Sequence, residues 1–174
     1  GIRLLIERDV ELLYFLASAI ERAVPESRLY NLVKNVEEFD RAITAELDFT
    51  KEADNALRFA KNFEGHHDVR FPRIYRPWSA KKVMTLEFFD GQKVYDAVAN
   101  GFEADKITRS MLGVLIKSIF EDGFFHADPH PGNIIIMPNP DWAHPLIGVI
   151  DLGMVGRLSP ELRDRTVDLM VAAV

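Results

Sequence analysis

The chain has 174 residues, of which 48% are hydrophobic and 28% are charged, a composition that excludes a disordered segment or a fibrous repeat. The formal net charge is −6 and Lys and Arg do not cluster, which argues against a nucleic-acid-binding protein. The absence of cysteine excludes disulfides, cysteine-ligated zinc and a cysteine nucleophile.

No apolar run approaches the roughly 20 residues that are needed to span a bilayer. Gly1 opens directly into a helical pattern, without an initiator methionine or a signal peptide. We therefore expect the chain to be a fragment of a longer protein.

The first sixty residues have helical periodicity. Apolar residues recur close to every 3.6 positions over residues 2–24, and Pro25 ends that pattern. The same period runs over residues 29–60, and its length suggests a break at residues 48–50. The pattern predicts an amphipathic helix followed by a second, interrupted one.

The rest of the chain alternates short apolar runs with helical patterns. Residues 71–75 and 82–88 are rich in strand-forming residues and predict two neighbouring strands. Further elements are predicted at residues 94–99 (helix), 104–122 (helix), 134–137 (strand) and 146–150 (strand), with a turn at 138–141. Ser159-Pro160-Glu161 predicts a helix start, with Ser as N-cap and Pro at the first helical position.

Two carboxylates and a carboxamide lie at the ends of these short strands. Asp128 and Asn133 belong to the stretch Phe-Phe-His-Ala-Asp-Pro-His-Pro-Gly-Asn at residues 124–133, and Asp151 follows the strand at 146–150. Kinase-like folds use such an order, Asp, then Asn, then a strand pair, then Asp-x-Gly, to position a nucleophile and to hold Mg²⁺. Asp128 is then the base or orienting carboxylate, and Asn133 and Asp151 are the oxygen ligands of Mg²⁺.

The sequence resembles the UbiB-type (aarF-domain) atypical kinases of coenzyme Q biosynthesis. Residues 124–133 match the hallmark loop of that family nearly letter for letter. Residues 46–55 look like its Glu-x-Asp helix motif, and residues 151–158 look like its metal-binding motif. The resemblance extends over essentially the whole chain.

The resemblance implies an α+β, protein-kinase-like fold, in which residues 1–88 form an incomplete small lobe and residues 89–174 the large lobe. It implies that Glu46, with Glu52 as the substitute, pairs with a lysine on a small-lobe strand, and that Asp48 belongs to the same motif. The alternative is that this segment is an ordinary helix and that these three residues are solvated surface charges. The lysine strand, a phosphate-binding loop and the Lys-x-Gly-Gln element of the family lie outside this chain.

The resemblance also places the adenine-binding hinge at residues 87–89. An adenine edge needs one acceptor and one donor, and the Glu87 carbonyl and Phe89 amide are the candidates, with the aromatic pair Phe88 and Phe89 as a wall. An ordinary strand end is the alternative for this segment. ATP and Mg²⁺ are the implied cofactors, and ATP hydrolysis that supports ubiquinone synthesis is the implied activity.

Partners and location follow only from the family. They are a nucleotide and, beyond it, a quinone-precursor lipid or other coenzyme Q biosynthesis proteins. The family works at the inner membrane, on its cytoplasmic or matrix side, and any membrane contact is expected through parts outside this chain.

Two other functions are open. His126, Asp128 and His130, with Asp151 and His144, offer residue types suited to Zn²⁺, Mn²⁺ or Fe²⁺ in a metal-dependent phosphoesterase. His126 and His130 are alternatively loop-ordering residues. A catalytically inactive kinase-like interaction domain is the other alternative, because a fold does not determine a function.

The segment after Asp151 argues against a peptide substrate. Only residues 154–158 separate Asp-Leu-Gly from the predicted helix start, and Ala127 occupies the position of the arginine that pairs with an activation-loop phosphate in protein kinases. We therefore expect ATP hydrolysis, or phosphoryl transfer to a small-molecule or lipid-linked acceptor. We also expect the Asp151 carboxylate to be desolvated at its strand end and compensated by a cation.

Overall fold

A computed structural model describes residues 2–137 and 145–172, and its chain divides into two compact units, Gly1–Asp48 and Phe49–Val174. The predicted turn at 138–141 and His144 lie outside the described residues. A boundary between kinase lobes at residues 88 and 89 stays a prediction, since residues on both sides of it share the core of the second unit.

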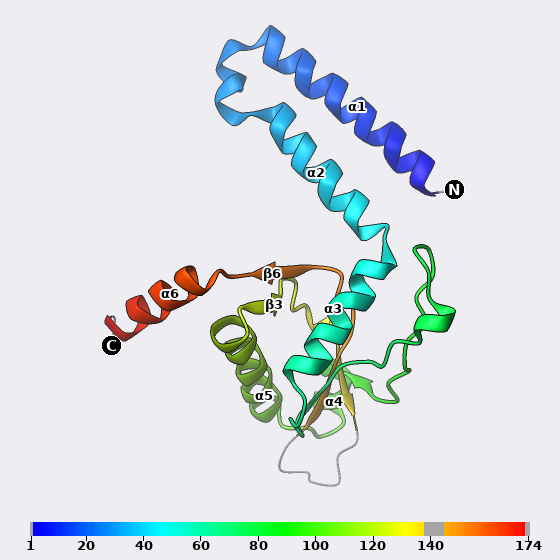
Figure 1. Ribbon diagram of the computed structural model, residues 1–174, viewed down its shortest axis with the longest axis vertical. Helices are drawn as coiled ribbons and strands as arrows, with labels where there is room; N and C mark the ends of the chain where they lie inside the picture. Colours follow the sequence, from blue (N-terminus) through cyan, green and yellow to red (C-terminus); the bar gives the residue numbers. More distant parts are fainter. Residues whose placement is uncertain (1, 138–144, 173–174) are drawn as a thin grey trace. The chain divides into compact units, whose positions relative to one another are not determined.

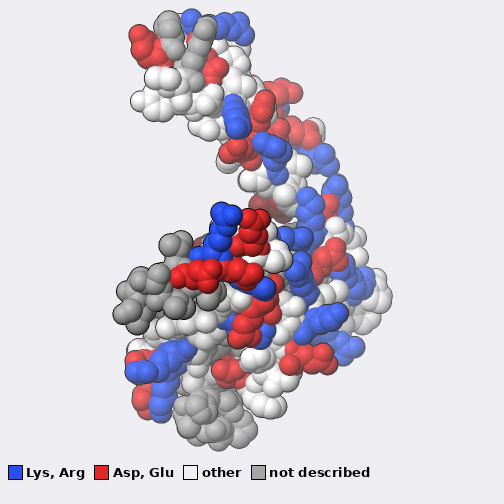
Figure 2. Space-filling view, turned by 60° about the vertical axis from the view of Figure 1, so that its left-hand side comes forward, with Lys and Arg blue, Asp and Glu red and all other residues white. Residues whose placement is uncertain are grey.

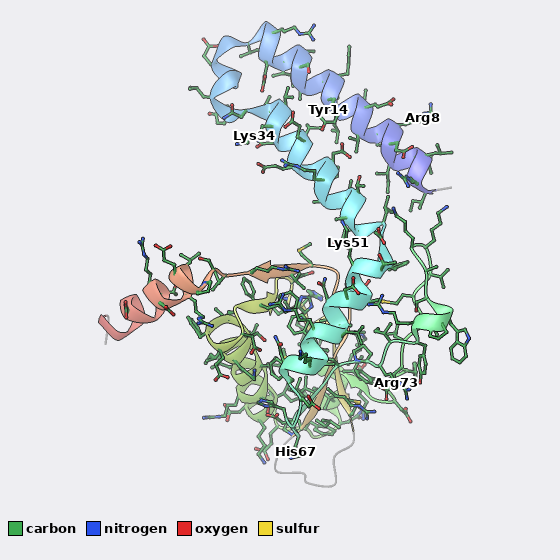
Figure 3. The ribbon with its side chains drawn as sticks, in the orientation of Figure 1. Arg8, Tyr14, Lys34, Lys51, His67 and Arg73 are labelled. Carbon is green, nitrogen blue, oxygen red and sulfur yellow. The ribbon has the colours of Figure 1, made fainter. Side chains whose placement is uncertain are left out.

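The first unit is an antiparallel pair of helices (Figure 1). Helix α1 (Ile2–Ala23) and helix α2 (Leu32–Glu46) are joined by a 3₁₀ segment, η1 (Pro25–Tyr30). Tyr14 points from α1 toward α2, where its hydroxyl lies 3.5 Å from Asp40 Oδ2 (Figure 3). The helix predicted at residues 2–24 is confirmed, and the break in the second helical pattern lies at residues 47–48, which overlaps the predicted break at Asp48.

The second unit is built on a four-stranded sheet with the order β1-β5-β4-β2. Its centre is the antiparallel pair β4 (Ile134–Met137) and β5 (Leu146–Val149), which confirms both strands predicted there. Strand β1 (Val69–Arg70) runs parallel to β5, and β2 (Gln92–Lys93) runs antiparallel to β4. A separate pair joins β3 (Phe124–His126) to β6 (Val155–Arg157).

The prediction of two strands at residues 71–75 and 82–88 is wrong, because neither segment forms a regular strand. These segments meet at one isolated bridge, Ile74 with Leu86, whose two residues lie on either side of the short 3₁₀ helix η2 (Arg76–Trp78); a second bridge, Ala80 with Val83, lies in the turn after η2. Pro72 and Pro77 lack the amide hydrogen that a ladder requires, which limits the pairing. The extended conformation itself is retained, with Tyr75 N donating to Thr85 O and Glu87 N to Arg73 O.

Helices precede, separate and follow the strands of this unit along the chain. Helix α3 (Phe49–Asn62) opens the unit, α4 (Val94–Ala99) follows β2, and α5 (Ala104–Ile116) continues into the π-helical turn η3 (Lys117–Glu121). Helix α6 (Pro160–Ala172) begins as predicted, because Ser159 Oγ accepts a hydrogen bond from Leu162 N at 3.2 Å. Helix α4 confirms the helix predicted at residues 94–99. Helix α5 together with η3 confirms the helix predicted at residues 104–122, whose last turn is π-helical.

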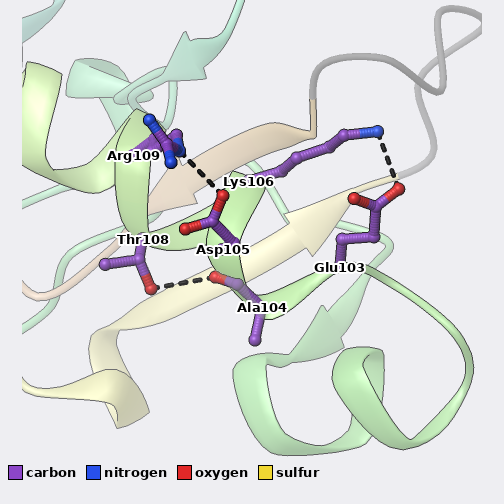
Figure 4. A network of polar contacts seen from close by, with 6 residues as sticks. All are labelled: Glu103, Ala104, Asp105, Lys106, Thr108 and Arg109. Carbon is purple, nitrogen blue, oxygen red and sulfur yellow. Dashed lines mark hydrogen bonds and ion pairs between the residues drawn. The ribbon is translucent and has the colours of Figure 1, made fainter.

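The first turn of α5 carries local polar pairs (Figure 4). Lys106 Nζ lies 2.8 Å from Glu103 Oε1, Arg109 Nε lies 2.7 Å from Asp105 Oδ2, and Thr108 donates to the Ala104 carbonyl. Exposed pairs of this kind are screened by solvent and contribute little to stability. They support the start of the helix, whereas its buried residues Ile107 and Val114 attach it to the core.

The described surface mixes charges of both signs. On the visible face of each unit, Lys and Arg side chains alternate with Asp and Glu side chains (Figure 2). Within residues 2–137 and 145–172, none of the helices is long and apolar enough to cross a membrane.

The core of the second unit centres on three phenylalanines from different elements. The Phe59 ring of α3 stacks on Phe71 at a centroid distance of 5.1 Å and contacts Phe124 of β3 at 4.7 Å. Phe59 and Phe124 are fully buried, with Ile136, Ile147 and Leu152 of the adjoining strands and loop. This cluster fixes α3 against the segments that carry the candidate site residues.

Replacing Phe59 by Ala should destabilise the protein by about 3 to 5 kcal/mol, because it removes a ring from this closed cluster and leaves a cavity. Leu57→Ala on the same helix is the matched control, since Leu57 is 45% exposed and should cost far less. Urea unfolding of both variants measures the difference. Equal destabilisation would show that the aromatic cluster does not hold α3.

Candidate active site

The β4 and β5 strands bring two of the predicted metal ligands to one edge of the sheet. Asn133 immediately precedes β4, and Asp151 follows β5 after one residue. Beyond the last ladder pair, Ile134 with Val149, the Ile150 amide donates to the Asn133 carbonyl at 2.9 Å. The backbones that carry the Asn133 and Asp151 side chains are therefore adjacent.

The loop before β4 is folded by its own backbone and by two imidazoles. His130 N donates to the Asp128 carbonyl at 2.7 Å, and Asn133 N donates to the His130 carbonyl at 2.8 Å. The Asn133 carboxamide nitrogen lies 3.5 Å from the same Asp128 carbonyl, which orients its Oδ1 as the acceptor that remains available. Among the described residues, no hydrogen bond or ion pair occupies the exposed Asp128 carboxylate.

Both histidines order this loop. His126 Nδ1 lies 3.2 Å from the Met154 carbonyl and 3.3 Å from the Asp128 amide, and His130 Nδ1 accepts from Gly132 N at 3.0 Å. In the part of the chain that the structure describes, no three His, Asp or Glu side chains are grouped to hold a metal. Both imidazoles thus take part in loop contacts, and the phosphoesterase alternative stays a prediction.

Asp151 has an unusual backbone conformation. Its φ angle is +58°, in the left-handed region that non-glycine residues rarely adopt, although Asp and Asn do so more readily than others. Its side chain is exposed, so the expectation of a desolvated carboxylate is wrong, because the turn carries the residue away from the buried strand that precedes it. Strained residues held in this way cluster at active sites.

Helix α3 holds the backbone on the other side of Asp151. Glu52 Oε1 accepts a hydrogen bond from Leu152 N at 3.2 Å. Asn55 Nδ2 donates to the Leu152 carbonyl at 2.9 Å and lies 3.4 Å from the Gly153 carbonyl. The sequence pattern singles out Glu52, whereas Asn55 is only the last residue of the motif at 46–55, with no role assigned to it.

A cavity of about 780 Å³ joins the predicted hinge to Asp151. It is lined by Glu52, Met84, Thr85, Leu86, Glu87, Phe88, Phe89, Gly91, Lys93, Ile135, Ile150 and Asp151. Thus four separate segments of the second unit meet around a single space, and half of the lining residues have apolar side chains.

In the predicted hinge segment, which lines this cavity, two backbone groups have no hydrogen-bond partner among the described residues. Glu87 directs its carboxylate to Arg70 Nη2 and to the Arg73 amide. Among the described residues, no hydrogen bond occupies the Glu87 carbonyl or the Phe89 amide. Phe89 is buried against Gly148, whereas Phe88 is 87% exposed.

Lys93 is a cavity residue that the sequence reading missed. It lies in β2, and its Nζ donates to the Gly132 carbonyl, directly beside Asn133. The two-residue strand that carries it is too short for a periodicity signal. Its place two residues after Gly91, in the segment that continues from the hinge, is the signal that could have found it, since both residues line the cavity.

Glu46 and Asp48 belong to the other compact unit. Glu46 is the exposed last residue of α2, and Asp48 is the last residue of the first unit, whereas Glu52 lies in α3 of the second. The roles predicted for Glu46 and Asp48 stay predictions.

The fold and the loop geometry define an atypical kinase-like domain. The structure is similar to one solved as the complex of Rv3197 with erythromycin from Mycobacterium tuberculosis, with a TM-score of 0.64 and 23% identity over 96% of this chain and 44% of that chain. Residues 1–174 match the family described as ABC1 atypical kinase-like domain. The chain belongs to this family, which confirms the kinase-like α+β fold.

The sequence relatives agree. The chain is 36% identical over 167 residues to the probable protein kinase UbiB of Aliivibrio fischeri, and equally so to that of Azotobacter vinelandii. The matches cover 92% and 94% of this chain but only 30% and 31% of those proteins. The UbiB-type resemblance is confirmed, and the chain spans about three tenths of the length of these relatives.

The left-handed backbone of Asp151 predicts an order of stability among its variants. Asp151→Asn should unfold like the parent, because Asn tolerates this conformation, and Asp151→Gly should be more stable than Asp151→Ala by about 1 kcal/mol. Urea unfolding curves of the three variants give this order. Equal values for the Gly and Ala variants would contradict the conformation described here.

Proposed function

We propose that the complete protein binds ATP with Mg²⁺ and either hydrolyses it or transfers its terminal phosphoryl group to a small-molecule or lipid-linked acceptor. The cavity that extends from the free hinge backbone to Asp151 carries this proposal. Its volume of about 780 Å³ lies in the range of ligand pockets, and its lining combines apolar walls with a few polar groups.

The adenine ring is proposed to lie along the hinge. The Glu87 carbonyl can accept from the exocyclic amine, and the Phe89 amide can donate to a ring nitrogen. Phe88 offers an exposed ring as a wall, while Phe89 supports the segment from the core. A nucleotide complex with the base remote from residues 87–89 would overturn this assignment.

The residues present fit a magnesium ion. Asn133 Oδ1 and the Asp151 carboxylate are hard oxygen donors on adjacent backbones, and Mg²⁺ is usually held by one or two protein oxygens together with phosphates and water. When bound, the ion would neutralise charge on the phosphate oxygens. Asp128, exposed and uncommitted, would hold and accept the proton of the attacking hydroxyl or water.

A peptide substrate is disfavoured by the segment after Asp-Leu-Gly. Met154 O accepts from the Ala127 amide, β6 then pairs with β3, and Leu158 N donates to Gly123 O before α6 begins. Figure 1 shows β6 leading directly into α6. No residues between Gly153 and Ser159 are left to form a docking loop for a peptide.

A role in ubiquinone synthesis belongs to the same proposal. It rests on the UbiB name of the relatives and on the motifs shared with that family. A quinone-precursor lipid, or another protein of that pathway, is the proposed partner, at the inner membrane. An inactive interaction domain is the competing account, and the following variants distinguish it.

Two variants of the full-length protein separate binding from chemistry. Asp151→Asn keeps the size and backbone preference of the residue but removes a charge, so Mg²⁺-dependent nucleotide binding should weaken. Asp128→Asn should leave that binding intact and lower turnover by roughly 10²- to 10⁴-fold, the usual contribution of a positioned acid or base. ATP titration at several Mg²⁺ concentrations and phosphate release measure the two effects.

Thermal unfolding of both variants is the folding control. Binding of Mg-ATP by Asp151→Asn as tight as the parent's would remove Asp151 from the metal site. Binding without any turnover in the parent would favour the inactive domain, and strong phosphorylation of generic peptides would contradict the proposed acceptor class.

Lys93 is proposed to contact the nucleotide phosphates. Lys93→Met keeps the length of the stem and removes the charge, so affinity for ATP should fall by about tenfold, as expected for the loss of one charge-assisted hydrogen bond. Affinity for adenosine, which has no phosphate, should not change. Lys106→Met, at a half-buried lysine on α5 that does not line the cavity, is the matched control, and an equal loss for ATP and adenosine would exclude a phosphate contact.

A further inference from the structure

Asn55 is a buried polar residue whose contacts lie next to the proposed metal ligand. It is 9% exposed, and it shares the buried face of α3 with Ala56 and Phe59. Both of its contacts, the Leu152 and Gly153 carbonyls, are acceptors. The orientation of the carboxamide is therefore fixed, with Nδ2 toward the backbone.

Asp151 lies between two fixed points of the backbone. On its N-terminal side, Ile150 N is bound to the Asn133 carbonyl. On its C-terminal side, Asn55 holds the Leu152 and Gly153 carbonyls, and Glu52 holds the Leu152 amide. A residue in the left-handed region persists only where its surroundings hold it there.

We propose that Asn55 is a positioning residue for the metal site, which keeps the Asp151 backbone in its left-handed conformation so that the carboxylate faces the cavity beside Asn133. This inference rests on the proposed function. Asn55 itself does not line the cavity and so acts through the peptide units that follow Asp151.

Asn55→Asp is the most informative variant because it keeps the shape of the side chain. It replaces the NH₂ group, which faces the Leu152 and Gly153 carbonyls, with a carboxylate oxygen that cannot donate. In the full-length protein, the Mg²⁺ concentration for half-maximal ATP binding should rise by about tenfold or more, as for other residues that support metal ligands. Adenosine binding without Mg²⁺ should stay unchanged. Asn62→Asp makes the same substitution on the same helix, without a comparable backbone contact among the described residues, and is the matched control.

Asn55→Ala, which buries no new charge, tests the same point independently. If Asn55 acts through the Asp151 carboxylate, Asn55→Ala should shift the Mg²⁺ dependence in the parent but not in an Asp151→Asn background. Amide hydrogen exchange at residues 151–153 should accelerate in Asn55→Ala, while exchange in the β4 and β5 strands stays at the parent's rate.

Unchanged Mg²⁺ dependence, equal shifts in both backgrounds, or a global loss of folding in both Asn55 variants would overturn the positioning role. The proposed function fails in a different way, by absence of Mg-ATP binding in the parent. In that case the hydrogen exchange at residues 151–153 still reports whether Asn55 holds this backbone.

Discussion

The antiparallel pairing of β4 with β5 is the interaction on which the candidate site depends. The ladder extends from Met137 paired with Leu146 to Ile134 paired with Val149, and the Ile150 amide continues it to the Asn133 carbonyl. Since Asn133 accepts this last hydrogen bond and Asp151 directly follows its donor, Ile150, any slip in register would separate them. The buried residues on these strands, such as Ile136 and Ile147, fix the register by placing their side chains in the core.

The second constraint comes from the opposite side of the strand ends. Helix α3 is attached to the core by Phe59, and the same helix gives Glu52 and Asn55 to the backbone that follows Asp151. The apolar cluster and the polar contacts thus share one helix. A disturbance of the aromatic packing should therefore reach the site through the orientation of α3, even though Phe59 is remote from the cavity lining.

The sequence predicts the parts of the fold and site that have strong local signals. The strands at 134–137 and 146–150, the helix start at Ser159 and the convergence of Asn133 with Asp151 follow from apolar runs, a capping pattern and strand ends. The strands β1, β2, β3 and β6 are two or three residues long, too short to show a period of two, and they exist because partner strands are present. Lys93 and Asn55 were missed for the same reason, since their roles depend on contacts with segments about 40 and 100 residues away in the chain.

Under the proposed function, the charges around the cavity explain why a cation should accompany the nucleotide. Glu52, Glu87 and Asp151 line it, Asp128 lies exposed on the adjoining loop, and among the described lining residues Lys93 supplies the positive charge. Glu87 is offset by Arg70, but Asp151 has no such partner within the described residues. Like charges near a protein surface repel each other, although solvent weakens the repulsion at an exposed group, so a triphosphate without a cation would be disfavoured beside Asp151. A divalent ion between the carboxylate and the phosphates reverses the sign of that interaction, and for this reason the affinity of the site for nucleotide should depend on the metal more than on any single side chain.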